Sequence, residues 1–397
     1  MGRNEGFMLE SIIKINQAVN GFIWGVPAMI CIIGVGLLLS VRTRFIQVRK
    51  FGAAMKNTIG KIFDKTQAKD GSMSPFQAVC TALAGTVGTG NIAGVAGAIA
   101  LGGPGAIFWM WCSAFLGMCT KFSEVTLAIH FREKNANGEY VGGPMYYIKN
   151  GLKKHWHWLA YLFSALGVLT VFGTGNATQV NTITAALDSA LINYNIISAD
   201  STHMINLIIG IIIMILIALI MIGGIKRIGR VTEKLIPFMA VLYVLFVGVL
   251  VITNITKVPT AFKIIVEAAF SPRAITGGVV GSMLVAMQKG VARGIFSNEA
   301  GLGSAPIAAA AAQTKEPVRQ GLVSMTGTFI DTIVICTLTG LSIVITGAWQ
   351  VDGLQGVQVT TYAFQNGLPF PAQVSSFVLM LCLVFFAFTT ILGWDYY

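Results

Sequence analysis

Charged residues are scarce in this chain. They make up 11 % of its 397 residues, whereas hydrophobic residues make up 55 % and the mean hydropathy is +0.74. Soluble globular domains carry about 25 % charged residues, so this composition excludes an ordinary soluble domain. The apolar runs 205–222, 236–252 and 374–392 are each long enough to cross a bilayer. We therefore expect an all-α polytopic membrane protein.

Patterns for disulfides, metals and common enzyme sites are also missing. The six cysteines lie in apolar segments without a CxxC pair, and the four histidines lack metal-ligand spacing. The string GTG at 88–90 lacks the third glycine and the preceding strand of a dinucleotide fingerprint. Since no buried histidine or acidic cluster offers a nucleophile and base, the sequence argues against an enzyme.

The net charge of +11 indicates membrane orientation rather than nucleic-acid binding. Lys and Arg gather in the loops 41–74 and 131–157 and after the fifth and seventh predicted spans, while 191–202 and 348–370 contain none. By the positive-inside rule, this alternation places the N-terminus outside the cytoplasmic membrane. The basic loop 255–276 is an exception. Beyond the lipid bilayer and a small-molecule substrate, we expect no nucleic acid and no obligate protein partner.

Hydropathy and loop composition predict nine membrane spans. They are 20–40, 75–101, 104–130, 158–190, 203–224, 233–254, 277–308, 319–347 and 371–393. The second and the seventh spans are irregular. Residues 81–111 carry no charge but contain eight glycines, and residues 277–306 contain charges and a proline. An unwound backbone within a membrane is tolerated where it lines a cavity or binds a ligand.

The spacing of the two irregular spans predicts an inverted repeat. Five spans separate their starts, and an odd-numbered unit repeated in tandem must invert in the membrane. We expect 1–74 to form an extra N-terminal helix and a basic loop, 75–254 the first repeat, and 255–397 an incomplete second repeat. Counting spans in this way predicts about two further C-terminal helices that this chain lacks.

Three segments resemble one known family. TALAGTVGTGNIAGVAGAIALGGPGAIFWMW at 81–111, GGPMYYIKNGL at 142–152 and GVARGIFSNEAGLGSAP at 290–306 are similar to the alanine or glycine:cation symporters, also called sodium:alanine symporters. The resemblance covers essentially the whole chain. It implies the five-plus-five inverted-repeat fold of neurotransmitter:sodium symporters and a carrier of alanine and glycine. The coupling ion that it implies is sodium, with a proton as the alternative.

The first break supplies groups for a zwitterionic amino acid. Free N–H groups at the start of the outer half-helix suit the carboxylate, and free carbonyls at the end of the inner half-helix suit the ammonium and sodium. We expect the break at 85–91. The candidate substrate-binding residues are Thr86, Thr89, Gly90, Asn91, Gln179, Gly281, Ser282, Met283 and Trp394.

The sodium ligands are implied by the wider fold that the chain resembles. They are the carbonyls of Ala84 and Val87 and the hydroxyls of Thr389 and Thr390. Hard oxygen donors of this kind suit sodium. Asn91 is a candidate for a second cation site.

Each of these assignments has an alternative. Gly90 and Gly94 also fit simple helix packing, and Thr389 and Thr390 also fit bonding back to helical carbonyls. Gln179 is equally suited to interhelical bonding, and Trp394 to an interfacial belt. The break in the seventh span falls at 277–283, which we favour, or at 294–303; with the former, 297–299 forms a cytoplasmic gate or a structural network.

These patterns predict a secondary active transporter that imports alanine and glycine by sodium symport with alternating access. Proton-coupled symport and an uncoupled facilitator of the same substrates are the alternatives, and a membrane enzyme is the least supported.

Overall fold

The computed structural model describes residues 3–58, 60, 74–194, 196–197, 202–270, 283–314 and 316–396. Within these ranges the helices and strands are joined by turns and loops. The elements are helices apart from one short antiparallel pair of strands, β1 (Glu133–Lys134) and β2 (Tyr140–Val141). The predicted all-α class is therefore confirmed for the described residues.

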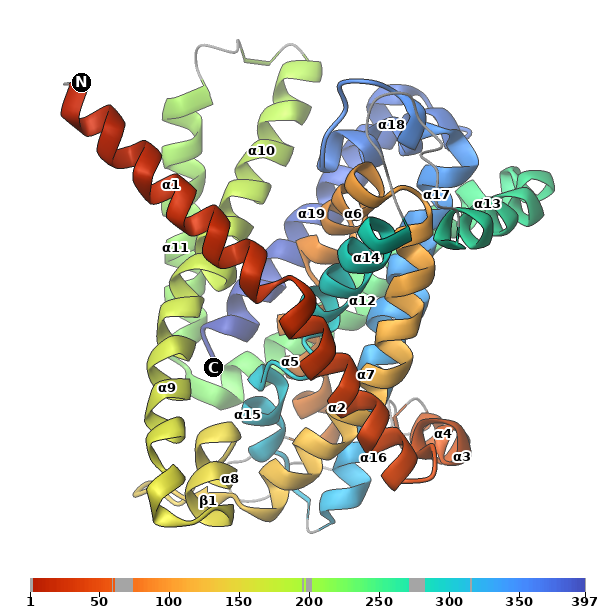
Figure 1. Cartoon of the computed structure of the whole chain (residues 1–397). Coiled ribbons are helices and arrows are strands. Elements are labelled where there is room, and N and C mark those ends of the chain that lie inside the picture. Colours follow the sequence, from red (N-terminus) through yellow and green to blue (C-terminus); the bar gives the residue numbers. More distant parts are fainter. Residues whose placement is uncertain are drawn as a thin grey trace.

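Long helical segments account for most of the fold (Figure 1). They are α1 (Arg3–Ile23) with α2 (Val26–Arg42), α5 (Pro75–Thr86) with η2 (Thr89–Asn91) and α6 (Ala93–Gly102), α7 (Gly105–His130), α9 (Trp158–Thr170) with η4 (Val171–Ala177) and α10 (Thr178–Asn193), α11 (Thr202–Met221), α12 (Gly224–Thr253), α16 (Pro317–Thr328) with η7 (Phe329–Cys336) and α17 (Thr337–Thr346), and α19 (Ala372–Trp394).

Shorter helices connect or flank these segments. They are α3 (Ile46–Arg49), α4 (Phe51–Thr58), α8 (Pro144–Gly151), η3 (Lys154–Trp156), η6 (Ile255–Lys257), α13 (Val258–Phe270), α14 (Met283–Asn298), α15 (Ser304–Ala310), η8 (Ala348–Gln350) and α18 (Val357–Gly367). The elements η4 and η7 are π-helical turns inside otherwise α-helical spans.

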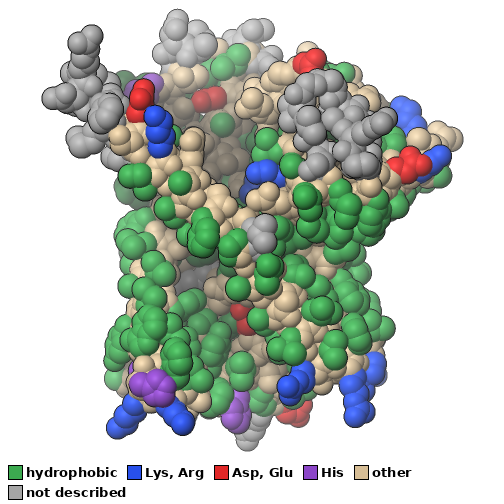
Figure 2. Space-filling model, in the orientation of Figure 1, with side chains coloured by type: hydrophobic (Ala, Val, Ile, Leu, Met, Phe, Trp, Pro, Cys, Tyr) green, Lys and Arg blue, Asp and Glu red, His purple; other side chains and the backbone are tan. Residues whose placement is uncertain are grey.

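Seven described helices are long and apolar enough to cross a membrane, and one bent pair makes an eighth. These match eight of the nine predicted spans. The remaining one, 277–308, lies partly outside the described residues and contains the shorter helices α14 and α15. Figure 2 shows hydrophobic side chains across most of the middle of one face and Lys and Arg along its lower edge. The surface fits a polytopic membrane protein.

One end of the bundle is polar and tied together by hydrogen bonds. The elements α8 and β1 lie at this end, and α18 lies at the other end of the bundle (Figure 1). Arg132, just after α7, donates to the carbonyls of Ala310 and Ala312 at 2.9 and 2.7 Å, and so caps the C-terminal end of α15. Hydrogen bonds from Asn150 and Lys149 hold the pKa of Glu133 below its usual value. This end carries the basic loop 131–157, which the charge pattern assigns to the cytoplasm.

The inner half of the bent span begins at a well-defined point. Ser74 Oγ accepts from the Gln77 N–H at 3.1 Å, and Gln77 Oε1 accepts from the Ser74 N–H at 3.0 Å. This reciprocal capping box, with proline at the first helical position, starts α5 at Pro75. At its other end α5 stops at Thr86, and the chain bends by 59° before it continues into α6.

Glycines allow α14 to approach α7 closely. A Cβ at Gly290 would lie 2.8 Å from Trp109 Cβ, and a Cβ at Gly294 would overlap Ser113 Oγ. Small residues four apart let helix backbones pack tightly in membranes, where apolar surface alone gives little drive for association. Through this contact α7 holds one of the two interrupted segments in place.

We expect Gly290→Leu to destabilise the protein, because the added side chain must displace Trp109 or the backbone of α7. Overpacking of this kind costs about 1–3 kcal/mol. Thermal unfolding of the purified protein should show a lowered midpoint. The matched control is Gly248→Leu in α12, where a Cβ meets nothing within 4 Å. Equal midpoints for the two variants would contradict the proposed packing role.

Candidate functional site

Two interrupted helical segments lie side by side in the structure. The first runs from α5 through η2 into α6, and the second from α14 through 299–303 into α15. A Cβ at Gly90 would lie 3.7 Å from Phe296 Cδ1 and from Ser297 Cα, so η2 touches the end of α14. The first interruption lies within the predicted range 85–91.

The second interruption that the structure describes agrees with the alternative prediction, whereas the preferred range, 277–283, lies outside the described residues except for Met283. Among the described residues α14 ends at Asn298, and the turn 299–303 agrees with the alternative location, 294–303. Gly281 and Ser282 lie outside the described residues, and Met283 begins α14 without lining the cavity described below. Lys289 and Arg293 lie on α14, which packs against α6.

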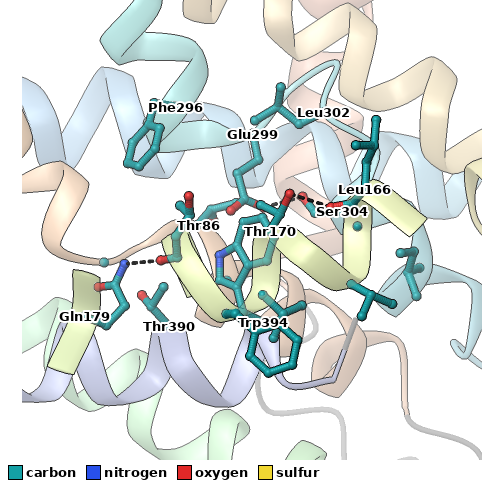
Figure 3. Close-up of a pocket in the computed structure, with 18 of the residues that line it drawn as sticks. Thr86, Leu166, Thr170, Gln179, Phe296, Glu299, Leu302, Ser304, Thr390 and Trp394 are labelled. Carbon is teal, nitrogen blue, oxygen red and sulfur yellow. Dashed lines mark hydrogen bonds between the residues drawn. The ribbon is translucent and has the colours of Figure 1, made fainter. Parts of the chain in front are cut away.

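A cavity of about 510 Å³ lies between the two interruptions, the α9–η4 segment and α19 (Figure 3). It brings together five predicted substrate-binding residues and one predicted sodium ligand, which come from three separate spans: Thr86, Thr89, Gly90, Gln179, Trp394 and Thr390. Residues from η4 and α9 also line it, among them Phe163, Thr170 and Thr174. These sequence-derived candidates thus converge on one cavity.

Side-chain hydrogen bonds hold the first break open. The Gly88 N–H donates to Asn91 Oδ1 at 2.8 Å, which satisfies a backbone donor that the helix cannot. The Thr89 hydroxyl donates to Gln179 Oε1 at 3.0 Å, and Gln179 Nε2 donates to the Thr174 carbonyl at 3.2 Å. Gln179 therefore ties η2 to the π-helical turn η4 across the cavity.

Asn91 lies behind the cavity wall and does not line it. Its Nδ2 donates to Asp331 Oδ1 at 2.6 Å and to Ser297 Oγ at 3.0 Å, and the Thr339 hydroxyl donates to its carbonyl at 2.7 Å. Asp331 is fully buried and also accepts from Ser297 Oγ at 2.8 Å. The side chain of Asn91 therefore joins η2 to α14 and η7, which is a structural position.

Two of the four predicted sodium ligands face each other directly. Thr390 Oγ1 lies 3.5 Å from the Val87 carbonyl oxygen. Two oxygens that share a cation at about 2.4 Å, as in calcium sites, lie about this far apart. Ala84 lies against Gly393, where a Cβ would come within 2.9 Å of the Ala84 carbonyl carbon. Thr389 Oγ1 donates to the Phe385 and Phe386 carbonyls and lies 3.3 Å from Met239 Sδ. Thr390 Oγ1 also donates back along its helix, to the Phe386 carbonyl at 2.9 Å.

Glycine is required at the centre of the break. A Cβ at Gly88 would overlap Thr390 Oγ1 and lie 3.2 Å from Thr390 Cβ. The close approach of α19 to the unwound backbone therefore depends on the absence of a side chain at this position.

Sequence reasoning missed Glu299 as a cavity residue. Its carboxylate accepts a hydrogen bond from the Ser304 hydroxyl, and a second side-chain hydrogen bond joins it to Trp394. The backbone φ of Glu299 is +55°, an unusual conformation for a residue other than glycine. The run of turn-forming residues after Asn298 is the signal in the sequence that could have placed the second break, and with it Glu299, at the cavity.

The chain matches the model of the sodium:alanine symporter family over residues 9–397. It is 50 % identical to an uncharacterized transporter of Haemophilus influenzae, over 98 % of this chain and 81 % of that protein. It is 45 % identical to the sodium/alanine symporter AgcS of Methanococcus maripaludis, over 97 % and 82 %. A putative sodium/proton-dependent alanine carrier protein of Bacillus subtilis, YrbD, is 38 % identical, over 96 % and 76 %.

These matches describe carriers and not enzymes, and they agree with the apolar helices and the cavity between them. The chain belongs to the sodium:alanine symporter family and is a multi-pass membrane protein that transports amino acids.

Proposed function

We propose that this protein imports alanine and glycine across the cytoplasmic membrane together with sodium, by alternating access with its N-terminus outside. The convergence of the predicted break residues on one cavity between two interrupted helices carries this proposal. The name of the relative YrbD keeps proton coupling as an alternative for the ion.

The first break offers partners for both ends of a zwitterion. The N–H groups of Thr89 and Gly90 start the η2 turn and have no acceptor within it, so they can receive a carboxylate. Carbonyls released where α5 ends can receive the ammonium and the cation. The apolar wall contains Phe163, Phe296 and Trp394, which limits the space for the side chain.

We place the coupling sodium beside Val87 and Thr390, with Ala84 and Thr389 completing the site. The separation of the Val87 and Thr390 oxygens supports the first two. Thr389 would have to turn away from Met239 to take part, so the geometry favours a larger contribution from Thr390.

The arrangement also supports two inverted repeats, 75–254 and 255–397, each beginning with an interrupted span. In such folds one bundle rocks against the other around a site near the membrane midplane. The π-helical turns η4 and η7 lie beside the cavity and the Asp331 network respectively. Because π turns recur at functional positions in helices, they are suited to local rearrangement.

In proteoliposomes, we expect an inward sodium gradient to drive accumulation of alanine above its external concentration. Glycine should compete, whereas glutamine should compete poorly because the cavity wall is bulky. Matched vesicles with only a proton gradient, or with no cation gradient, are the controls. Accumulation driven by the proton gradient alone would show that protons, and not sodium, are the coupling ion. Uptake that is independent of both gradients would contradict symport.

We expect Thr390→Ala to raise the sodium concentration for half-maximal alanine binding by about tenfold, as the loss of a hydroxyl bound to a charge implies. Thr389→Ala should have a smaller effect. Thr182→Ala provides a control, because this α10 hydroxyl only bonds back to the Thr178 carbonyl. Equal sodium titrations for the Thr390 and Thr182 variants would remove Thr390 from the sodium site.

Gly88→Ala should weaken sodium-dependent binding for a steric reason, since the methyl group must push the Thr390 hydroxyl away from Val87. Gly97→Ala on α6, where a Cβ meets nothing within 4 Å, should bind normally. The double variant Gly88→Ala with Thr390→Ala should be little worse than Thr390→Ala alone, because the overlap with the hydroxyl is gone and only a 3.2 Å contact with the Cβ of residue 390 remains. Additive losses in the double variant would show that Gly88 acts independently of Thr390.

A further inference from the structure

Glu299 is the one ionisable side chain among the described residues that line the cavity. It is only 3 % exposed and comes from the turn between α14 and α15. Figure 3 shows Glu299, Thr390 and Trp394 facing the same space. An ionisable group inside a membrane is costly and is normally paired or functional.

The partners of this carboxylate are neutral. The Ser304 hydroxyl and the Trp394 side chain hold it by hydrogen bonds. Among the described residues, the ion pairs found within 4.0 Å are Lys149–Glu133 and Lys263–Glu267, which do not involve Glu299. Its charge is therefore not matched by a contacting cation.

A buried lysine lies near enough to act on Glu299 electrostatically, but it forms none of the ion pairs found within 4.0 Å among the described residues. Lys121 of α7 interacts electrostatically with Glu124, Glu299 and Asp331, and its Nζ has no hydrogen-bond partner. One ammonium group thus faces three carboxylates. Because buried charges require opposite charges nearby, this cluster, when it is ionised, favours entry of a further positive charge, and Glu299 is its member on the cavity.

We propose that Glu299 forms a subsite for a monovalent cation, which replaces Ser304 and Trp394 as the partner of the carboxylate. This inference rests on the proposed function, because the cation is either the ammonium group of the amino acid or the coupling sodium. Both carry a single positive charge that binds carboxylate oxygen. The ammonium group does so by donating hydrogen bonds, and sodium by direct coordination. Release of Ser304 would link occupation of the cavity to the turn before α15.

The test compares Glu299→Gln with the wild-type protein in lipid nanodiscs, by calorimetric titration with alanine and with sodium. The amide keeps the shape of the side chain and removes its charge. We expect the affinity for alanine, or the affinity for sodium, to fall by about tenfold or more. Glu124→Gln is the control from the same charge cluster, since Glu124 accepts from the Gly301 N–H at 3.1 Å and does not line the cavity.

Two arms distinguish the source of the cation. If the ammonium group occupies the subsite, Glu299→Gln weakens alanine binding even at saturating sodium. If sodium occupies it, the sodium titration without alanine weakens, and saturating sodium restores alanine affinity. Unchanged titrations with both ligands, at an unchanged midpoint of thermal unfolding, would overturn the inference. Absence of sodium-dependent alanine binding by the wild-type protein would instead overturn the proposed function and this inference with it.

Ser304→Ala keeps the inference falsifiable if Glu299→Gln fails to fold. Removing the hydroxyl frees the carboxylate, so cation-dependent alanine binding should be as strong as in the wild-type protein or stronger. If Glu299 only pins the turn through Ser304, the same change should lower the unfolding midpoint and weaken binding, which would overturn the inference.

Discussion

Backbone groups released inside a membrane have no water to bind, and this constraint governs the arrangement around both helix interruptions. The Gly88 N–H bonds to Asn91 Oδ1, the Ala300 N–H to Asn298 Oδ1 and the Gly301 N–H to Glu124. In each case a side-chain oxygen takes a donor that the helix has lost. An interrupted span is stable only where such oxygens accept the released N–H groups.

The same side chains determine which helices must be neighbours. Asn91 can satisfy Gly88 only while its amide group bonds to Asp331 and Ser297, so η2, η7 and α14 meet. Asn298 bonds to Thr332 at 3.0 Å and so anchors the second turn to η7 as well. Thr89 and Gly90 of η2 line the cavity, whereas Asn91 and its partners in this polar network do not. The unwound backbone therefore has one face fixed by the protein and one face available to a ligand.

Much of the fold follows from local composition. The low charge and the long apolar runs predicted eight spans that the described helices contain, and the glycine-rich segment predicted a break within 85–91. For the second break, the preferred range 277–283 lies outside the described residues except for Met283, and the interruption that the structure describes is at 299–303. The range 277–283 was preferred because it keeps Lys289 and Arg293 near water. In the structure Arg293 lies 4.9 Å from the centre of the Phe296 ring and fits beside Gly94. Cation–π contact and the space left by a glycine offset part of a cost that the sequence pattern overstates.

The sequence by itself determined the membrane class, the first interruption and a set of polar residues that are expensive to bury in spans. Those properties depend on residue types within one segment. Only the tertiary structure decided which of these residues share a cavity: Gln179 and Thr390 line it, Asn91 lies behind it, and Glu299 enters it from a turn. Such choices depend on contacts between residues far apart in the sequence, such as Val87 and Thr390, which are 303 positions apart. They also depend on the close helix packing that glycines allow.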